Sequence, residues 1–156
     1  MQIIRAYRPS DIGEITELFF RTVRETTAGE YTEKQRAVWA PCRPDPDIWD
    51  RELRAHHTAV VLDKGIIVGF GDIHPSGFLD RLFVHAEHQR KGIGSILCCR
   101  LEKAVPGTVT VHASLTARAF FEKRGYTVLA ARTENRNGIS LPYFLMEKVR
   151  RKEPAD

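Results

Sequence analysis

The six residues 89–94 read Gln-Arg-Lys-Gly-Ile-Gly, which are residue types that a phosphate-binding loop uses. The apolar segment 78–84 before them is predicted to be a strand, and residues 95–102 after them are predicted to begin a helix. Glycines let a ligand approach the backbone closely, and the N-terminus of a helix offers unpaired N–H groups to an anion. Arg90 and Lys91 add positive charge, so the segment predicts a site for a phosphorylated cofactor.

The glycine spacing excludes two better known phosphate motifs. The run has no third glycine, which the dinucleotide fingerprint G-x-G-x-x-G requires, and no G-K-[ST] follows, as a Walker loop requires. A G-x-G on its own is also compatible with a plain turn. The strand before the run, its basic pair and the apolar helix after it favour the phosphate site.

A Gln-x-x-Gly-x-Gly run after such a strand resembles the pyrophosphate-binding motif of the GNAT superfamily of N-acetyltransferases. Residues 84–89 (VHAEHQ) resemble the approach to that motif, and residues 117–126 (ARAFFEKRGY) resemble the family's later helix, which ends in Gly followed by an aromatic. Residues 141–148 (LPYFLMEK) resemble its last strand. The details of 113–118 and 146–148 are most similar to a bacterial YafP-like branch. The resemblance covers nearly the whole chain.

The resemblance implies an α/β fold with a mixed, mostly antiparallel central sheet and helices on both faces. Its fourth and fifth strands are expected to splay and admit the pantetheine arm of acetyl-CoA, which serves as a co-substrate without a metal. A backbone N–H near the end of the fourth strand is expected to polarise the thioester carbonyl. The residues expected to contact the cofactor are Leu82, Phe83, Val84, Gln89, Arg90, Lys91, Gly92, Ile93, Gly94, Ser95, Ser114 and Phe121.

The implied activity is acetyl transfer to a primary amine of a small molecule or peptide, by direct attack in a ternary complex. Orientation of two bound reactants supplies much of the rate enhancement in such a reaction. The alternative is a non-catalytic acyl-CoA-binding sensor of the same fold. Phe121 favours the sensor, and Asp80 favours the enzyme.

The expected general base is Asp80, a charged residue in an otherwise apolar strand. A partly buried carboxylate has a raised pKa and can accept a proton directly or through water. The alternative is a structural salt bridge to Arg81 or Arg51. Asp72 and His74, on the preceding strand, are expected to face the cleft and contact the acceptor.

The position where the family carries its general acid departs from the family pattern in this chain. Members often carry Phe-Tyr in the helix after the fifth strand, whereas this chain has Phe120 and Phe121, and Phe121 has no proton to donate. Ser114 also replaces the family's usual Asn. The remaining side-chain donors are Tyr126 and Tyr143, with water and the substrate ammonium as alternatives. Tyr126 is also suited to packing in the core.

The irregular early region is expected to determine which amine is accepted. Tyr31 and Trp39 are its main candidates for substrate binding, because aromatic rings can enclose a cationic amine. The alternative is that Trp39 and Trp49 anchor two short helices to the sheet. For His112 the favoured expectation is a hydrogen-bonding role in the core.

Composition is that of one globular domain, expected over residues 1–150 with a frayed tail at 151–156. Of the 156 residues, 42% are hydrophobic and 28% are charged. No apolar run approaches the roughly 18 residues of a membrane span, and the N-terminus does not resemble a signal peptide, so a cytoplasmic location is expected. The expected partners are acetyl-CoA and an amine acceptor, and a homodimer is compatible with the sequence.

The formal net charge is +4. Because Lys and Arg are spread along the chain, solubility and attraction for an anionic cofactor explain this charge better than nucleic-acid binding does. The three cysteines form no C-x-x-C pair and the six histidines no H-E-x-x-H, so no metal site is predicted. Cys98 and Cys99, which are adjacent within a predicted helix, are expected to be small core residues.

Hydrophobic periodicity and turn residues predict the element order. Strands are expected over 1–7, 58–62, 66–74, 78–84, 109–113, 126–133 and 139–149, and helices over 11–26, 32–39, 47–56, 93–104 and 116–124. Thr32 and Gln35 are expected to form a capping box, and Asp47 to cap the third helix. Asn137 and Gly138 predict a tight hairpin turn.

Overall fold

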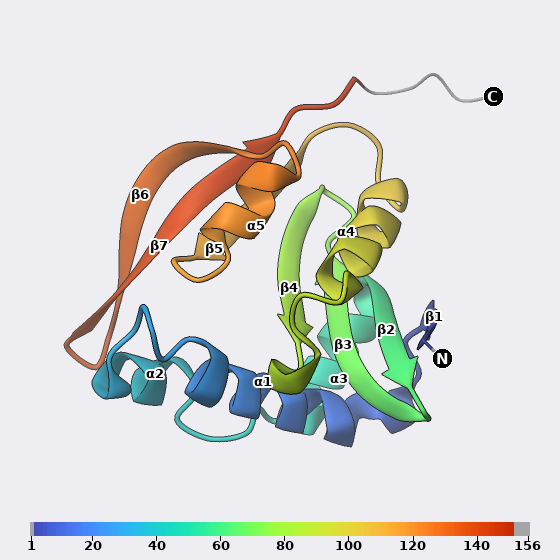
Figure 1. The fold of residues 1–156 in the computed structure, drawn as a ribbon, viewed down its shortest axis with the longest axis horizontal. Helices are drawn as coiled ribbons and strands as arrows, with labels where there is room; N and C mark the ends of the chain where they lie inside the picture. The colour runs from blue at the N-terminus through green and yellow to red at the C-terminus, as the bar shows by residue number, and fades with distance from the viewer. Residues whose placement is uncertain (1, 152–156) are drawn as a thin grey trace.

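The computed structural model describes residues 2–151 and contains one seven-stranded sheet in the order β1-β2-β3-β4-β5-β7-β6 (Figure 1). Neighbouring strands are antiparallel except β4 and β5, which are parallel. The strands are β1 (Gln2–Ala6), β2 (His57–Asp63), β3 (Ile66–Ile73), β4 (Phe78–Val84), β5 (Val109–Ser114), β6 (Thr127–Arg136) and β7 (Ile139–Lys148). The mixed, mostly antiparallel sheet expected from the sequence is confirmed.

Helices cover both faces of the sheet. They are α1 (Ile12–Thr26), α2 (Glu33–Trp39), α3 (Pro46–Ala55), α4 (Ile93–Lys103) and α5 (Arg118–Lys123), with short 3-10 turns η1 (Pro9–Asp11) and η2 (Ala86–His88). One core lies between the sheet and α1 and α3, and includes Ile15, Val23 and Phe70. The other lies beneath α4 and α5 and includes Leu97 and Met146. Among residues 2–151, no helix is long and apolar enough to cross a membrane.

Local sequence signals explain most element boundaries. The Thr32 hydroxyl accepts from the Gln35 N–H while the Gln35 side chain accepts from the Thr32 N–H, which is the expected capping box. The expected cap at Asp47 is wrong. Asp45 caps α3 instead, because its side chain accepts from the N–H groups of residues 47 and 48, and Pro46 occupies the first helical position, where no N–H is needed.

The expected tail at 151–156 lies outside the described residues beyond Arg151, and the domain limits stay a prediction. Cys98 is buried as expected, but its neighbour Cys99 is exposed. Leu97, Cys98 and Leu101 form the buried side of α4, within about 100° of one another around the helix, and Cys99 falls outside that side.

The fourth and fifth strands separate after a short pairing. Their backbones pair only at Phe78–Thr110 and at Leu79–Val111. The rest of β4 therefore has no partner in β5, and the sheet opens there. This is the splay expected at these two strands.

A β-bulge in β4 lies where the opening begins. In the pairing of β3 with β4, Ile73 lies opposite Leu79 and Asp72 lies opposite Arg81, so Asp80 is the extra residue. A bulge can place two successive side chains on the same face of a sheet. Here the carboxylate of Asp80 lies 3.4 Å from the guanidinium of Arg81, on the face that α1 and α3 cover.

Candidate active site

The opening between β4 and β5 forms a cleft of about 840 Å³. Eleven of the twelve residues expected to contact the cofactor line it: Leu82, Phe83, Val84, Gln89, Arg90, Gly92, Ile93, Gly94, Ser95, Ser114 and Phe121. The exception is Lys91, which is exposed and does not line the cleft. The fold therefore brings together residues that are up to 39 positions apart in the sequence, from Leu82 to Phe121.

The loop before α4 has the backbone shape of an anion site. Arg90 and Gly92 both adopt left-handed conformations, with φ of 64° and 79°. Such residues curl the chain so that successive N–H groups converge on one side. A Cβ added to Gly92 would meet nothing within 4 Å, so the surface there is open to a ligand. The first N–H groups of α4 lie beside this surface and have no partner within the helix.

Two other loop residues have structural tasks. The Gln89 side-chain amide donates to the Val84 carbonyl at 2.7 Å and so ties the loop to the end of β4. A Cβ on Gly94 would lie 3.2 Å from the ring of Phe120, which is tighter than ordinary packing. Gly94 thus permits close packing of α4 on Phe120, in addition to its place in the cleft.

Arg81 organises a charged cluster in the wall of the cleft. Its guanidinium lies 2.7 Å from the buried carboxylate of Asp72 and 3.4 Å from that of Asp80, and it also pairs with Glu52. The guanidinium lies over the ring of Trp49, 4.4 Å from its centroid. One cation therefore faces three carboxylates, and the cluster keeps a negative balance when all three are ionised.

Asp72 and His74 lie elsewhere than expected, because neither lines the cleft. Asp72 is fully buried, where burial raises the pKa of its carboxyl although Arg81 and His56 oppose this rise. The Oδ2 atom of Asp72 binds the guanidinium of Arg81, whereas its Oδ1 has no hydrogen-bond partner among the described residues. His74 is exposed in the turn after β3, where its ring bonds to Ser76. These positions argue against acceptor binding by either residue.

His56, Asp72 and Asp80 offer ligand atoms within 4.8 Å of one another. The guanidinium of Arg81 already contacts both carboxylates, and a second cation between them would be repelled. We assign no metal to this cluster.

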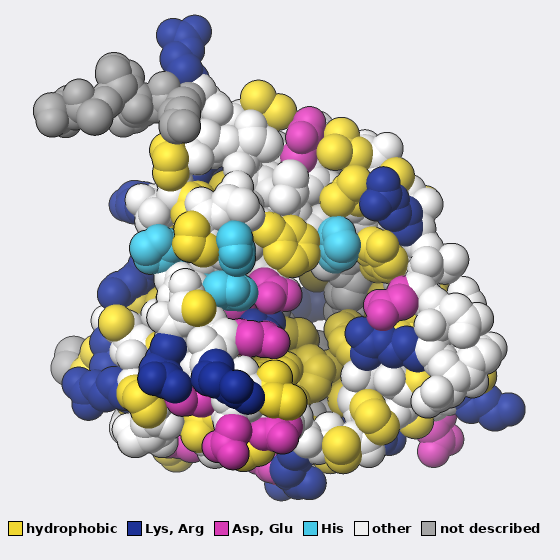
Figure 2. Space-filling view, turned by 180° about the vertical axis from the view of Figure 1, so that it is seen from behind, with side chains coloured by type: hydrophobic (Ala, Val, Ile, Leu, Met, Phe, Trp, Pro, Cys, Tyr) yellow, Lys and Arg dark blue, Asp and Glu magenta, His cyan; other side chains and the backbone are white. Residues whose placement is uncertain are grey.

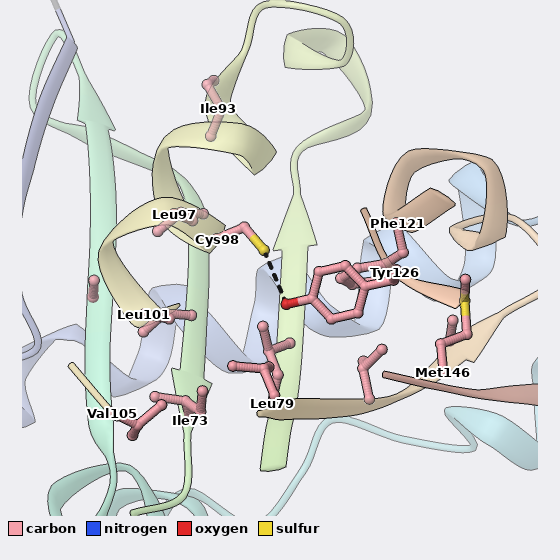
Figure 3. Packing of buried hydrophobic residues seen from close by; sticks show 14 of the residues in the cluster. Ile73, Leu79, Ile93, Leu97, Cys98, Leu101, Val105, Phe121, Tyr126 and Met146 are labelled. Carbon is pink, nitrogen blue, oxygen red and sulfur yellow. Dashed lines mark hydrogen bonds between the residues drawn. The ribbon is translucent and has the colours of Figure 1, made fainter. Parts of the chain in front are cut away.

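Tyr126 belongs to the core and not to the cleft. Its side chain is 2% exposed and lies among the buried residues beneath α4, with its hydroxyl directed at the sulfur of Cys98 (Figure 3). The same hydroxyl donates to the buried Glu102 carboxylate at 2.7 Å. Burial raises the pKa of this hydroxyl above its ordinary range. Arg124 and Lys148 also pair with Glu102. The role expected for Tyr126 as an acid does not fit this position, and the alternative reading as a core residue does.

The acceptor side of the cleft has aromatic walls. Tyr31 and Trp39 line it, with their rings edge to face at 5.2 Å. The Tyr31 hydroxyl accepts from the Leu115 N–H at 2.9 Å and donates to the Pro142 carbonyl at 2.7 Å. Tyr31 therefore joins the α1–α2 connection to the residue after β5 and to β7, and its hydroxyl is committed to these two backbone groups.

His112 and Tyr143 line the cleft near the point where β4 and β5 begin to separate. Their rings are 4.9 Å apart, and His112 also contacts the ring of Phe78 at 5.0 Å. The expectation that His112 forms hydrogen bonds in the core is wrong, because it is exposed and lines the cleft. The alternation of β5 carried this signal: Val109, Val111 and Ala113 face the core, so His112 must face the other side.

Figure 2 shows a hollow with hydrophobic walls on the face opposite to that of Figure 1, and histidine and acidic side chains gather beside it. The carboxylates that line the cleft are Asp80 and Glu134. Each is paired with an arginine that also lines the cleft, Asp80 with Arg81 and Glu134 with Arg136.

Comparison with known proteins gives one consistent family. Residues 27–149 match the model described as an acetyltransferase (GNAT) domain. The chain is 32% identical over 146 residues to the uncharacterized N-acetyltransferase YafP of Escherichia coli K12, covering 93% of this chain and 95% of that protein.

Solved structures agree with this result. A GCN5-related N-acetyltransferase from Rhodopseudomonas palustris is 29% identical with a TM-score of 0.89, covering 96% of each chain. The putative acetyltransferase yncA from Salmonella typhimurium, solved with its cofactor acetyl-CoA, has a TM-score of 0.74 at 20% identity, covering 100% of this chain and 98% of that one. The fold expected from the sequence is confirmed.

Proposed function

Because the chain belongs to the GNAT acetyltransferase family, we propose that it transfers an acetyl group from acetyl-CoA to a primary amine of a small molecule or peptide. The amine attacks directly while both reactants are bound. The observation that carries this proposal is the opening between β4 and β5, which leads from the loop at 89–95 to the charged residue Asp80.

The loop at 89–95 fits the pyrophosphate of the co-substrate. The left-handed conformations of Arg90 and Gly92 direct backbone N–H groups of the loop toward the open surface at Gly92. The guanidinium of Arg90 adds a positive charge that suits phosphate. The yncA relative was solved with acetyl-CoA, which supports the same ligand here. The part of β4 that has no partner in β5, from Asp80 to Val84, supplies backbone groups to the pantetheine arm, including an N–H near Phe83 or Val84 for the thioester carbonyl.

Asp80 is suited to prepare the amine for attack. The amine enters as an ammonium ion, which the negative balance around Arg81 attracts. Asp80 lies at the cleft with its side chain 34% exposed, so it accepts the proton directly or through a water molecule. The salt bridge to Arg81 exists as well, at 3.4 Å, and fixes the carboxylate at the bulge.

The departing thiolate requires a proton that Phe121 cannot supply. Of the two tyrosines expected as general acid, Tyr143 is still a candidate, because its half-buried side chain lines the cleft. Tyr126 does not remain, since its hydroxyl is committed to Glu102.

The second function that a specific observation favours is an acyl-CoA sensor without turnover, because Phe121 stands where relatives often have a tyrosine. A thiol-release screen with acetyl-CoA and a panel of primary amines separates the two functions. The enzyme releases thiol only when a suitable amine is present. A sensor binds acetyl-CoA, as calorimetry would show, and releases none with any amine.

A further inference from the structure

His112 has no task in the function proposed above, although it occupies a special position. On β5 it is the first residue after Val111, where the pairing with β4 ends, and Asp80 holds the equivalent position on β4. The two side chains therefore lie side by side at the start of the opening. Both line the cleft, and both lie on the sheet face that α1 and α3 cover.

The surroundings of His112 leave its ring nitrogens available. Its neighbours are the rings of Phe78 and Tyr143, which hold the imidazole by packing on both sides. Among residues 2–151, no hydrogen bond reaches a ring nitrogen of His112. In contrast, a ring nitrogen of His56 bonds to Asp72, and one of His74 bonds to Ser76. A histidine fixed by packing with unpaired nitrogens at a cleft is placed to exchange protons with a ligand.

We propose that His112 is a catalytic residue that carries a proton from the attacking nitrogen to the departing sulfur. This inference rests on the proposed acetyl transfer. It supplies the acid that the chain lacks at Phe121. One imidazole can exchange a proton with both atoms, because nitrogen and sulfur are bonded to the same carbon in the tetrahedral intermediate. The histidine of serine hydrolases serves two atoms in the same way.

The neutral amine forms the N–C bond with its lone pair, and the carbonyl π electrons move to oxygen. The nitrogen, now cationic, gives one proton to His112. When the oxygen electrons return, the C–S bond breaks and its electron pair leaves with sulfur, which takes the proton from the imidazolium. The products are the acetamide and the thiol of CoA, and His112 ends neutral.

The charges around His112 suit this task. Burial and Arg132 on β6 lower the pKa of the imidazole below its ordinary 6.5, while Asp80 on β4 and Glu134 on β6 oppose this effect. On β7, the facing titratable group is Tyr143. His112 is therefore neutral and ready to accept a proton near neutral pH. The same carboxylates stabilise the imidazolium while it carries the proton.

The test compares His112→Gln with His57→Gln, a matched control. His57 is also exposed and on a strand, but does not line the cleft. With an amine that the parent protein acetylates, kcat of His112→Gln is expected to fall by about 10²–10⁴-fold, the contribution of a typical general acid or base. Its Kd for acetyl-CoA should match that of the parent. His57→Gln should behave as the parent, and added imidazole should restore part of the rate of His112→Ala.

A nuclear magnetic resonance titration gives a readout that is independent of activity. The His112 ring is expected to titrate below pH 6.5 in the parent and lower still in Asp80→Asn, because the neighbouring carboxylate is removed. If the His112 ring titrates in Asp80→Asn as it does in the parent, the Asp80 carboxylate and the His112 ring do not lie side by side, and the proposal is overturned.

Three kinetic outcomes also overturn it, and they are distinguishable. If the parent releases thiol with an amine and His112→Gln does so equally fast, His112 carries no proton and the acetyl transfer itself stands. If kcat falls together with acetyl-CoA affinity, and imidazole restores nothing, His112 only shapes the cleft. If the parent releases no thiol with any amine of the panel, the proposed acetyl transfer fails, and the role of His112 fails with it.

Discussion

Asp80 and His112 are each the first residue beyond the last backbone pair between β4 and β5. The bulge in β4 places the carboxylate on the same face as Arg81, and the alternation of β5 places the imidazole on that face too. An acceptor that enters the cleft therefore meets one group from each strand. The two proton transfers of amide formation, out of the ammonium and then onto the thiolate, can be divided between them.

Asp80→Asn keeps the size of the side chain and removes its charge. We expect kcat to fall by about 10²–10⁴-fold, which is what a general base contributes. The loss should shrink at high pH, where more of the amine is already neutral. Glu52→Gln is the matched control, because Glu52 also pairs with Arg81 but does not line the cleft. A pH–rate profile of Asp80→Asn that equals that of the parent would remove Asp80 from the mechanism.

Arg90 and Lys91 are neighbours of the same charge, but only Arg90 lines the cleft. Arg90→Glu is expected to weaken acetyl-CoA binding by at least about tenfold, since hydrogen bonds to charged groups contribute about 1.5–3 kcal/mol. Lys91→Glu makes the same change of charge outside the cleft and should weaken binding much less, most clearly at high salt. Calorimetry measures both. Equal losses would place the pyrophosphate elsewhere.

The sequence predicted the fold well because its signals are local or periodic. Capping, hairpin and glycine signals lie within a few residues, as at Thr32 and at the turn of Asn137 and Gly138, whose φ values are 51° and 79°. The error at Asp47 arose because Asp45 and Asp47 are both good caps and Pro46 between them decides the choice. Cys99 was expected in the core together with Cys98, but only Cys98 lies on the buried side of α4.

The cofactor side of the site could also be predicted, because its loop is one continuous segment. The acceptor side could not, because it depends on packing between distant elements. Asp72 is covered by Arg81 and His56, and Tyr126 is drawn into the core by Glu102. His112 could have been placed from the alternation of β5, but the importance of its position depends on where β4 and β5 part.

Glu102 links α4 to the C-terminal strands. Burial alone would raise the pKa of its carboxyl, but hydrogen bonds from Tyr126 and Arg124 outweigh burial and lower it. This stabilisation is therefore present above the ordinary pKa of 4.5 and is lost as the pH falls through the lowered value. Glu102→Gln should reduce the free energy of unfolding at pH 7 by about 1.5–3 kcal/mol.

Urea unfolding of the parent and of Glu102→Gln at pH 7 and near pH 3 checks this. The difference between the two proteins should shrink at the lower pH. Glu122→Gln is the control, because its pair with Arg118 is exposed and worth little. A difference that is the same at both pH values would show that the charge of Glu102 contributes nothing.

Phe121→Tyr adds a hydroxyl where relatives often carry one. If the parent lacks a tyrosine acid at this point, the variant should gain rate, most clearly at low pH, and should restore part of the activity of His112→Gln in the double variant. Tyr143→Phe tests the remaining donor. If Phe121→Tyr changes nothing while Tyr143→Phe abolishes turnover, Tyr143 supplies the proton.

The most direct test of the central claim measures both products of the parent protein with acetyl-CoA and a panel of primary amines. Thiol release is followed in solution, and the mass of each amine is determined afterwards. Acetyl transfer predicts that at least one amine gains an acetyl group in a one-to-one ratio with the thiol released. Tight binding of acetyl-CoA with no acetylated amine in the panel would contradict it and identify the protein as a sensor.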